Sequence, residues 1–306
     1  MLHVPFDLGI FAQNALAKHV HYGAILHIWS ADLLDISVAT ATKKRNRLVY
    51  SAPSVSSTRD HNKLPWIAGK TGITVTTPTQ AGLNLCLDLG ADPTKFAHLP
   101  LIATPFSEAA QKGESLRNEL GLSKSDFVIT VTDEMNIDSG HKLAIWSHAI
   151  VRWALEGVKL LLPGKGENYQ ALVSFAKNTY YFDSVYFTKS RFSAEELLSA
   201  CDIALYAGSS KQRNYADFIL AGSLGKARIA TATAESNELG AHRESAMLVK
   251  REPRCIGAKI LELCENAELR NKLSENARNQ TATENSREKC LEIRDQIYQS
   301  LRPIAR

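Results

Sequence analysis

Short apolar runs alternate along this sequence with longer segments in which apolar residues recur at helical spacing. In the first third of the chain, the apolar runs predict strands at 24–29, 47–51 and 72–77. The segments around them predict helices at 10–20, 32–42 and 78–90. Because a helix separates successive strands, we expect parallel pairing through right-handed crossovers.

The same alternation continues beyond residue 107. Strands are predicted at 127–131, 158–162, 184–187, 203–206, 228–232 and 246–249. Helices are predicted at 107–121, 141–156, 169–178, 193–200, 214–225, 253–265, 267–279 and 286–301, and a loop is predicted at 234–243. The proline-containing stretch 103–107 lies between the two series and is expected to be an interdomain linker.

Composition is that of a globular protein. With 306 residues, 44% of them apolar and 22% charged, the chain is long enough for two domains of ordinary size. The formal net charge is +4, from 36 basic and 32 acidic residues, and no block of like charge indicates a nucleic-acid-binding arm. The basic cluster 43–47 is interpreted as a solvated turn between a helix and a strand. The alternative for this cluster is a peripheral contact with anionic lipid headgroups or with a polyanionic acceptor.

The five cysteines indicate a reducing compartment, because they are odd in number, scattered, and without zinc-like spacing. Cys86 and Cys201 lie in apolar runs and are expected to be core residues. Residues 1–11 lack the basic region and the long apolar segment of a signal peptide, and no run approaches the ~18 apolar residues of a membrane span. These features predict a soluble, cytoplasmic protein without a metal site.

The segment 201–226 is the clearest candidate for ligand binding. A short apolar strand is followed by a polar loop rich in glycine and serine, and then by a helix that begins near Asn214 and stops at Gly225. Glycine supplies the positive φ that helix C-termini commonly adopt. Such a unit directs the N-terminal amides of its helix toward the carboxyl edge of a parallel sheet, where a phosphate is favoured. The alternative is a purely structural unit, since many α/β proteins contain one with no phosphate bound.

Three motifs in this region resemble those of a known family. They are ELLSACD before the strand (196–202), LAGSLGK at the end of the helix (220–226) and AESNE, which closes a later loop with a glutamate (234–238). Together they resemble the signature region of the family-4 glycosyltransferases, which have the two-domain GT-B fold. The resemblance continues in order over roughly residues 24–300, through the segments 100–102, 116–121, 159–166 and 246–249.

The resemblance implies a GT-B-like α/β architecture of two Rossmann-like domains with parallel sheets. It implies an acceptor-side domain at 1–104, a donor-side domain at 105–285, and a last helix at 286–306 that packs back on the first domain. The N-terminal domain is expected to be abbreviated, because only residues 1–23 precede its first predicted strand and the family's glycine-rich acceptor loop is absent. Either this domain is naturally minimal or the chain is truncated at its start.

The resemblance also implies a nucleotide-diphosphate sugar as co-substrate, with no metal and no other cofactor. The family's donor-site arginine and lysine fall at Glu134 and Ser139, its paired glutamates at Gln212 and Leu220, and its N-terminal histidine near Ala52. A glutamate in place of arginine repels a diphosphate, a change of several kcal/mol where the site is partly desolvated. A leucine leaves a ribose hydroxyl without a partner, which costs about 1–3 kcal/mol.

Other residues on the same loops are candidates to compensate for these losses. Lys211 and Arg213 flank Gln212 before the helix, Lys142 lies in the first turn of another helix, and Lys165 lies between two glycines. The predicted donor-binding residues are Gly140, Lys142, Gly164, Lys165, Lys211, Arg213 and Asn214, and the predicted catalytic residues are Gln212 and Glu238. The alternative is that the cations are solvated loop residues and that Glu238 is a helix-capping or surface carboxylate.

Two functions from different classes follow. The first is transfer of a sugar from a nucleotide-diphosphate sugar to a glycan or lipid-linked acceptor, with a diverged donor site. The second is a catalytically inactive GT-B pseudo-transferase that binds a protein partner or a glycan; Glu134, Ser139 and Leu220 motivate it. A third interpretation, another GT-B enzyme such as a nucleotide-sugar epimerase, ranks below both because the 220–226 segment resembles the transferases.

Overall fold

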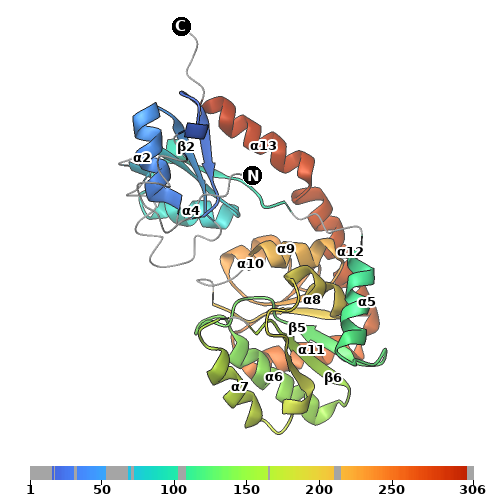
Figure 1. Cartoon of the computed structure of the whole chain (residues 1–306). Helices are drawn as coiled ribbons and strands as arrows, with labels where there is room; N and C mark the ends of the chain where they lie inside the picture. The colour runs from blue at the N-terminus through green and yellow to red at the C-terminus, as the bar shows by residue number, and fades with distance from the viewer. Residues whose placement is uncertain are drawn as a thin grey trace. The chain divides into compact units, whose positions relative to one another are not determined.

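A computed structural model describes residues 16, 18–30, 33–52, 68–69, 72–102, 108–164, 166–209 and 215–301. The chain forms two compact units, residues 1–100 together with 288–306, and residues 101–287 (Figure 1). The helix expected at 10–20 falls largely outside the described residues, and the linker expected at 103–107 falls wholly outside them.

The N-terminal unit is small and is built on a parallel sheet of four strands in the order β1-β2-β3-β4. The strands are β1 (Ile25–Ile28), β2 (Arg47–Ser51), β3 (Ile73–Thr77) and β4 (Phe96–His98), with helices α2 (Leu34–Lys44) and α4 (Gln80–Asp88) after β1 and β3. The three strands predicted here are confirmed. The pattern does not predict β4, because three residues are too few to show a period.

Alternation along the strands gives this sheet two chemically different faces. Tyr50 and Val75 belong to an apolar core that α2 and α4 complete. On the opposite face, Nε2 of His27 is hydrogen-bonded to the Ser51 hydroxyl at 2.7 Å, and that hydroxyl is hydrogen-bonded to Thr76 at 2.7 Å. The second face therefore carries hydrogen-bonded polar side chains, in agreement with the alternation of apolar residues and threonines along β3.

The last helix, α13 (Arg287–Ser300), belongs to the N-terminal unit although it follows the second unit in sequence. The Tyr298 hydroxyl is hydrogen-bonded to Nδ1 of His27 at 2.6 Å, and the ring of Trp29 stacks on the imidazole at a centroid distance of 4.3 Å. Burial, assisted by the nearby Arg294, lowers the pKa of His27 to about 4, so its ring is neutral at pH 7. The expected return of the last helix to the N-terminal domain is confirmed.

The second unit is built on a parallel sheet of six strands in the order β10-β9-β8-β5-β6-β7. The strands are β5 (Phe127–Thr130), β6 (Val158–Leu162), β7 (Val185–Phe187), β8 (Ile203–Tyr206), β9 (Ala227–Thr231) and β10 (Met247–Val249). All six predicted strands of this region are confirmed, and they pair in parallel as expected.

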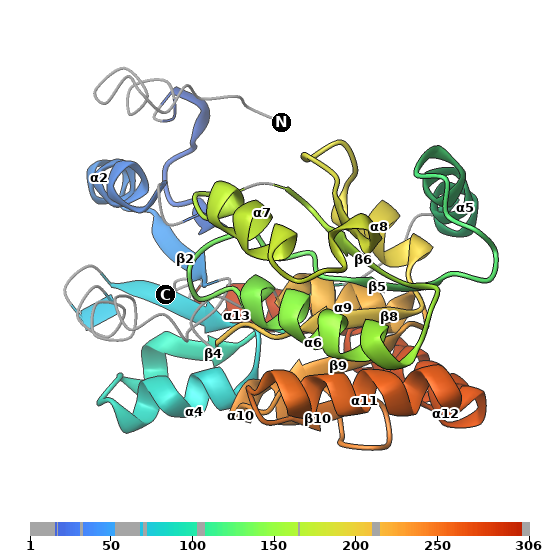
Figure 2. The same ribbon diagram turned by 90° about the horizontal axis from the view of Figure 1, so that it is seen from below.

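Helices cover both faces of this sheet (Figures 1 and 2). One face carries α6 (His141–Ala154), α7 (Tyr169–Lys177), α11 (Pro253–Glu265) and the first part of α12 (Ala267–Glu284). The other carries α5 (Ala109–Glu119), α8 (Ala194–Ala200), α9 (Tyr215–Ser223) and α10 (Ala234–Leu239). Strand residues alternate between the two cores, Ile129 and Leu205 toward the first, Val128 and Tyr206 toward the second. Burial on both faces explains why these strands read as largely apolar runs.

One prediction for this unit is wrong, because part of the expected loop at 234–243 forms helix α10. Thr233 caps this helix: its hydroxyl accepts a hydrogen bond from the amide of Ser236 at 3.1 Å, and the Ser236 hydroxyl accepts one from the amide of Thr233 at 2.8 Å. A helix this short shows no apolar period, and the capping box is the signal that could have found it. The positive φ predicted at Gly225 is confirmed, at 64°.

Three features considered from composition are the cysteines, the basic cluster 43–47 and membrane-spanning helices. Cys86 and Cys201 are buried, as expected, and the cysteines of the described residues are all free thiols. The basic cluster 43–47 spans the last turn of α2 and the turn into β2, with Arg45 closing the helix at a φ of 52°. Within the described part of the chain, no helix is both long and apolar enough to cross a bilayer.

Candidate functional site

The strand order of the larger sheet identifies where a ligand is expected to bind. β5 is followed by α6 on one face, whereas its neighbour β8 is followed by α9 on the opposite face. The loops that leave the carboxyl ends of β5 and β8 therefore diverge, and open α/β sheets bind ligands in the crevice at such a switch point. The candidate site is built around residues 131–140 and 207–209, the described parts of these two loops.

Gly140 joins the two loops through a backbone contact that no other residue permits. Its φ is +83°, and a Cβ atom at this position would lie 2.2 Å from the carbonyl carbon of Ala207 and 2.5 Å from the amide nitrogen of Gly208. The amide of Ser209 donates a hydrogen bond to the carbonyl of Asp138 at 3.0 Å. The predicted residue Gly140 therefore lies at the switch point, where it allows the loops to touch.

Gly164, also predicted, has a similar role on the loop that follows β6. Its φ is +76°, and a Cβ atom would lie 2.4 Å from the amide nitrogen of Lys189, on the loop after β7. Its neighbour Gly166 has a φ of +132°, and a Cβ atom there would lie 2.6 Å from the amide nitrogen of Met135. The loops after β5, β6 and β7 are thus packed backbone against backbone along one edge of the sheet.

Arg251, on the loop after β10, forms hydrogen bonds at this edge of the sheet. Its Nε donates to the carbonyl of Ala207 at 3.3 Å, and its Nη2 donates to the carbonyl of Asp138 at 3.4 Å. The guanidinium thus spans the two loops of the switch point. Sequence analysis missed this residue; the available signal is its position directly after a strand that ends at the same edge.

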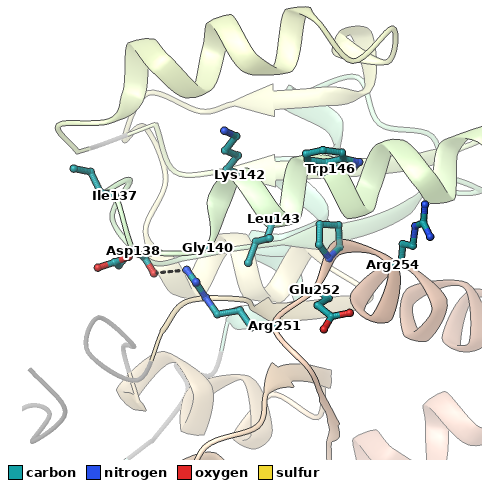
Figure 3. A pocket seen from close by; sticks show the side chains of 10 residues that line it. Ile137, Asp138, Gly140, Lys142, Leu143, Trp146, Arg251, Glu252 and Arg254 are labelled. Atoms are coloured by element: carbon teal, nitrogen blue, oxygen red, sulfur yellow. Dashed lines mark hydrogen bonds between the residues drawn. The ribbon is translucent and has the colours of Figure 1, made fainter.

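A pocket of about 620 Å³ opens beside these loops, between the N-termini of α6 and α11 (Figure 3). Its lining combines charged and apolar side chains: Ile137, Asp138, Gly140, Lys142, Leu143, Trp146, Arg251, Glu252, Pro253 and Arg254. Figure 3 shows the Arg251 guanidinium directed at the Asp138 backbone, with Leu143 and Trp146 along the α6 wall. Three cations against two carboxylates suit an anionic ligand that also carries an apolar or planar group.

Lys142, predicted to bind the donor, is exposed in the first turn of α6. Its ammonium lies 5.0 Å from the centroid of the Phe175 ring on α7, a cation–π contact. The side chain lines the pocket, but its charge is directed at the aromatic ring of the next helix.

The positions of the family's donor-site arginine and lysine carry Glu134 and Ser139 in this chain. Glu134 is exposed on the loop after β5, whereas Ser139 is buried. The Ser139 hydroxyl donates to the carbonyl of Asn136 at 2.6 Å and lies 2.7 Å from Nδ1 of His141. Burial lowers the pKa of His141 to about 4, so this imidazole is neutral at pH 7 and supplies no charge to an anion.

On α9, Leu220 is packed against the core of its face of the sheet, so the position of the family's second glutamate carries an apolar contact. Asp217, one helical turn earlier, is a buried carboxyl that sequence analysis missed. Burial raises its pKa to about 6, and the nearby Thr132 hydroxyl opposes this shift. Its position on the apolar side of an amphipathic helix is the signal that could have found it.

The remaining predicted residues are placed as follows. Glu238 is half-buried on α10, and its backbone carbonyl accepts a hydrogen bond from the Gln280 amide at 3.5 Å. Lys165, Lys211, Gln212, Arg213 and Asn214 lie outside the described residues. Gly140 and Lys142 line one pocket, and Gly164 lies on a neighbouring loop of the same edge.

The N-terminal unit holds a histidine beside the position of the family's histidine. Ala52 is buried, and the residue before it, Ser51, is hydrogen-bonded to His27 of the adjacent strand. No local pattern indicates this contact, because His27, Ser51 and Tyr298 come from two strands and a helix that are far apart in sequence. Within the described residues, no group of three or more His, Cys, Asp or Glu side chains is arranged to hold a metal ion.

No protein-family model matches the sequence, and no curated protein sequence matches it. Solved structures, in contrast, are similar to this chain. HepE from Anabaena in complex with UDP-glucose has a TM-score of 0.77 at 18% identity, over 96% of this chain and 83% of that one. A Rickettsia africae glycosyltransferase has a TM-score of 0.74 at 14% identity, over 97% and 81% of the two chains.

Sucrose-phosphate synthase from Thermosynechococcus elongatus has a TM-score of 0.73 at 14% identity, over 98% of this chain and 80% of that one. These similarities span both units, and the neighbours are GT-B glycosyltransferases. The chain therefore has the GT-B fold, as the resemblance in its sequence implies.

Proposed function

We propose that the protein is a glycosyltransferase that moves a sugar from a nucleotide-diphosphate sugar to a glycan or lipid-linked acceptor. The observation that carries the proposal is the junction of the loops after β5 and β8 at Gly140 and Ala207, at the switch point of a GT-B fold. HepE, which shares this fold, is in complex with UDP-glucose.

Transfer breaks the bond between the anomeric carbon and the diphosphate oxygen, so negative charge develops on the leaving diphosphate. The N-terminal amides of α6, which begins immediately after Gly140, supply partial positive charge at this edge. Arg251 adds a guanidinium held between the two loops. We assign the role of the cations that are missing at positions 134 and 139 to Lys211 and Arg213, which precede α9 in the sequence.

The sugar and ribose need hydrogen-bond acceptors rather than cations. We propose that Gln212 and Glu238 form hydrogen bonds with the sugar hydroxyls, as the sequence motif suggests. Asp217 offers a carboxylate one turn from Leu220, on the same helix. Because its pKa is about 6, this carboxyl is mostly ionised at pH 7 and accepts hydrogen bonds.

The test is release of nucleoside diphosphate from UDP-, GDP- and ADP-sugars, with and without mixed glycan and polyprenyl-phosphate acceptors. We expect acceptor-dependent release with one donor, and a loss of tenfold or more in kcat/KM when Lys211 and Arg213 are both changed to Ala. Lys124→Ala, an exposed lysine in the turn before β5, is the matched control and should leave the rate unchanged. Equal rates for the double variant and the wild type would contradict the assignment of these cations.

A second candidate function is a GT-B pseudo-transferase that binds a glycan or a protein partner without turnover. The burial of Ser139 and the packing of Leu220 into the core favour it, because both remove groups that hold the donor in the resembling family. Absence of acceptor-dependent release, together with saturable binding of a glycan, would support this candidate over the transferase.

A further inference from the structure

The outer surface of α6 and α7 exposes large aromatic side chains, of which only Trp146 also lines the pocket of the candidate site. Trp146 is 51% exposed and Trp153 is 83% exposed; seven residues apart on α6, they lie on one side of the helix, about 10 Å from each other. After α7, Tyr180 is 98% exposed and Phe182 is 37% exposed. Soluble proteins rarely gather so much apolar surface in one place without a partner.

Cations are interleaved with these rings. Lys142 lies 5.0 Å from the centroid of Phe175, whose ring is 6.1 Å from that of Trp146. Arg152 lies 5.4 Å from the Tyr181 ring, and Lys177 lies 5.8 Å from the Phe182 ring. We define the aromatic face as Trp146, Trp153, Tyr180 and Phe182 with the cations Lys142, Arg152 and Lys177.

The charged side chains on the two helices of this face have one sign. Helices α6 and α7 are described along their whole lengths, and neither contains an aspartate or a glutamate. Acidic residues lie only beyond the helix ends: Asp138 and Glu156 flank α6, and Glu167 and Asp183 flank α7. The two helices pack against each other, so their cations and rings belong to one continuous surface (Figure 1).

The rings protrude. Tyr180 has a φ of 59°, a left-handed conformation that bulky residues rarely adopt, and its side chain extends almost fully into solvent. Aromatic anchors of protein–protein interfaces are buried in packed pockets of the complex, whereas aromatic side chains at a bilayer surface lie at the level of the headgroups. Lysine and arginine beside them are attracted to anionic lipid, and their stems lie along the apolar surface.

We propose that the aromatic face binds the surface of an anionic lipid bilayer, with Trp153 and Tyr180 inserted at the headgroup level. This contact differs from the one considered for the basic cluster 43–47, which lies in the other unit. It is independent of sugar transfer, because vesicle binding is measured without a donor or an acceptor.

The test is co-sedimentation with vesicles of phosphatidylcholine, with and without phosphatidylglycerol. The wild type is expected to bind the anionic vesicles and to bind the neutral ones at least tenfold more weakly. Trp153→Ser and Tyr180→Ser should each weaken binding about tenfold, and Lys177→Glu by a similar factor. These three residues lie outside the pocket lining, so transferase activity in the absence of lipid should not change.

The matched controls carry the same changes elsewhere. Tyr22→Ser replaces a tyrosine that is 68% exposed in the N-terminal unit, and Lys272→Glu reverses an exposed charge on α12. Neither should change vesicle binding by more than about twofold. Equal losses in these controls and in the variants of the aromatic face would overturn the proposal.

A fluorescence measurement separates insertion from simple charge attraction. On addition of anionic vesicles, tryptophan emission should shift to shorter wavelength and be quenched by brominated lipid, and Trp153→Phe should remove a large part of both effects. Binding without quenching would overturn insertion. Concentration-dependent dimerisation that Trp153→Ser abolishes, without any vesicle binding, would show that a second copy of the chain covers this face and would overturn the proposal.

Discussion

Gly140 and Ala207 are in contact through their backbones, and a Cβ atom on Gly140 would lie 2.2 Å from the carbonyl carbon of Ala207. The two residues belong to loops that follow adjacent strands, β5 and β8, and lead to helices on opposite faces of the sheet. This contact shapes the crevice at the switch point, and the account of donor binding rests on it.

Replacing Gly140 with alanine should therefore damage the site and the fold together. The new methyl group meets backbone atoms that cannot rotate away, and the φ of +83° is itself strained for alanine. We expect Gly140→Ala to lower the free energy of unfolding by about 2–4 kcal/mol, measured by guanidinium denaturation.

Gly121→Ala is the matched control for this change. Gly121 also has a positive φ, +66°, but no atom lies within 4 Å of the position of its Cβ. Its substitution should cost only about 1 kcal/mol. Equal losses in both variants would mean that backbone strain alone, and not the contact with Ala207, constrains Gly140.

Asp217 should make the free energy of unfolding depend on pH. Its pKa is about 6 in the folded protein, against about 3.9 in an unfolded chain, so the folded state retains a proton that the unfolded state releases between these values. The associated stability is present below pH 4 and is lost as pH rises through 6, by about 2–3 kcal/mol. Asp217→Asn should therefore gain stability relative to the wild type between pH 4.5 and pH 8. A difference that is constant with pH would contradict the raised pKa.

The buried histidines should have the opposite effect. Burial lowers the pKa values of His141 and His148 to about 4, whereas an unfolded chain binds these protons near pH 6.5. Their contribution is complete above pH 6.5 and is lost as pH falls toward 4, by up to about 3 kcal/mol each. Two such groups outweigh Asp217, so the protein should become less stable between pH 7 and pH 4.5.

His148→Gln is the variant that tests this dependence, because glutamine can still donate to the Val158 carbonyl that His148 contacts at 3.1 Å. Denaturation curves at several pH values should show a shallower loss for the variant than for the wild type. If the wild type were equally stable at pH 7 and pH 4.5, the lowered pKa values would be wrong.

Tyr298 should hold α13 on the N-terminal sheet. Tyr298→Phe leaves Nδ1 of His27 without its partner, at a cost of about 1–2 kcal/mol. We expect faster hydrogen exchange along α13 and little change in the six-stranded unit. Tyr22→Phe, at an exposed position of the same unit, should leave exchange along α13 as in the wild type. Unchanged exchange in Tyr298→Phe would show that packing alone retains the helix.

Much of the fold follows from local patterns. β6 reads as a strand because Val158–Leu162 is an apolar run, interrupted only by Lys159, between turn residues. α9 ends where Gly225 permits a positive φ. Local patterns do not predict α10 or β4, because α10, with six residues, and β4, with three, are too short to show a period. Short elements depend on caps and on pairing with neighbours.

The site was less accessible to sequence reasoning, because its contacts join distant parts of the chain. Arg251 and Asp138 are separated by 113 residues, and no local pattern relates them. The burial of Ser139 and Asp217 likewise depends on which loops and strands surround them. The glycines Gly140 and Gly164 were identified as candidates for donor contact, and the structure adds that each permits two loops to touch.

Hydrogen exchange with and without nucleotide sugar tests the central claim most directly. The account predicts that one of UDP-glucose, GDP-mannose or ADP-glucose slows exchange of the backbone amides in residues 134–140 and 207–209, the two loops of the switch point. Protection confined to other parts of the chain, or no protection with any of the three, would contradict binding of the donor at this edge of the sheet.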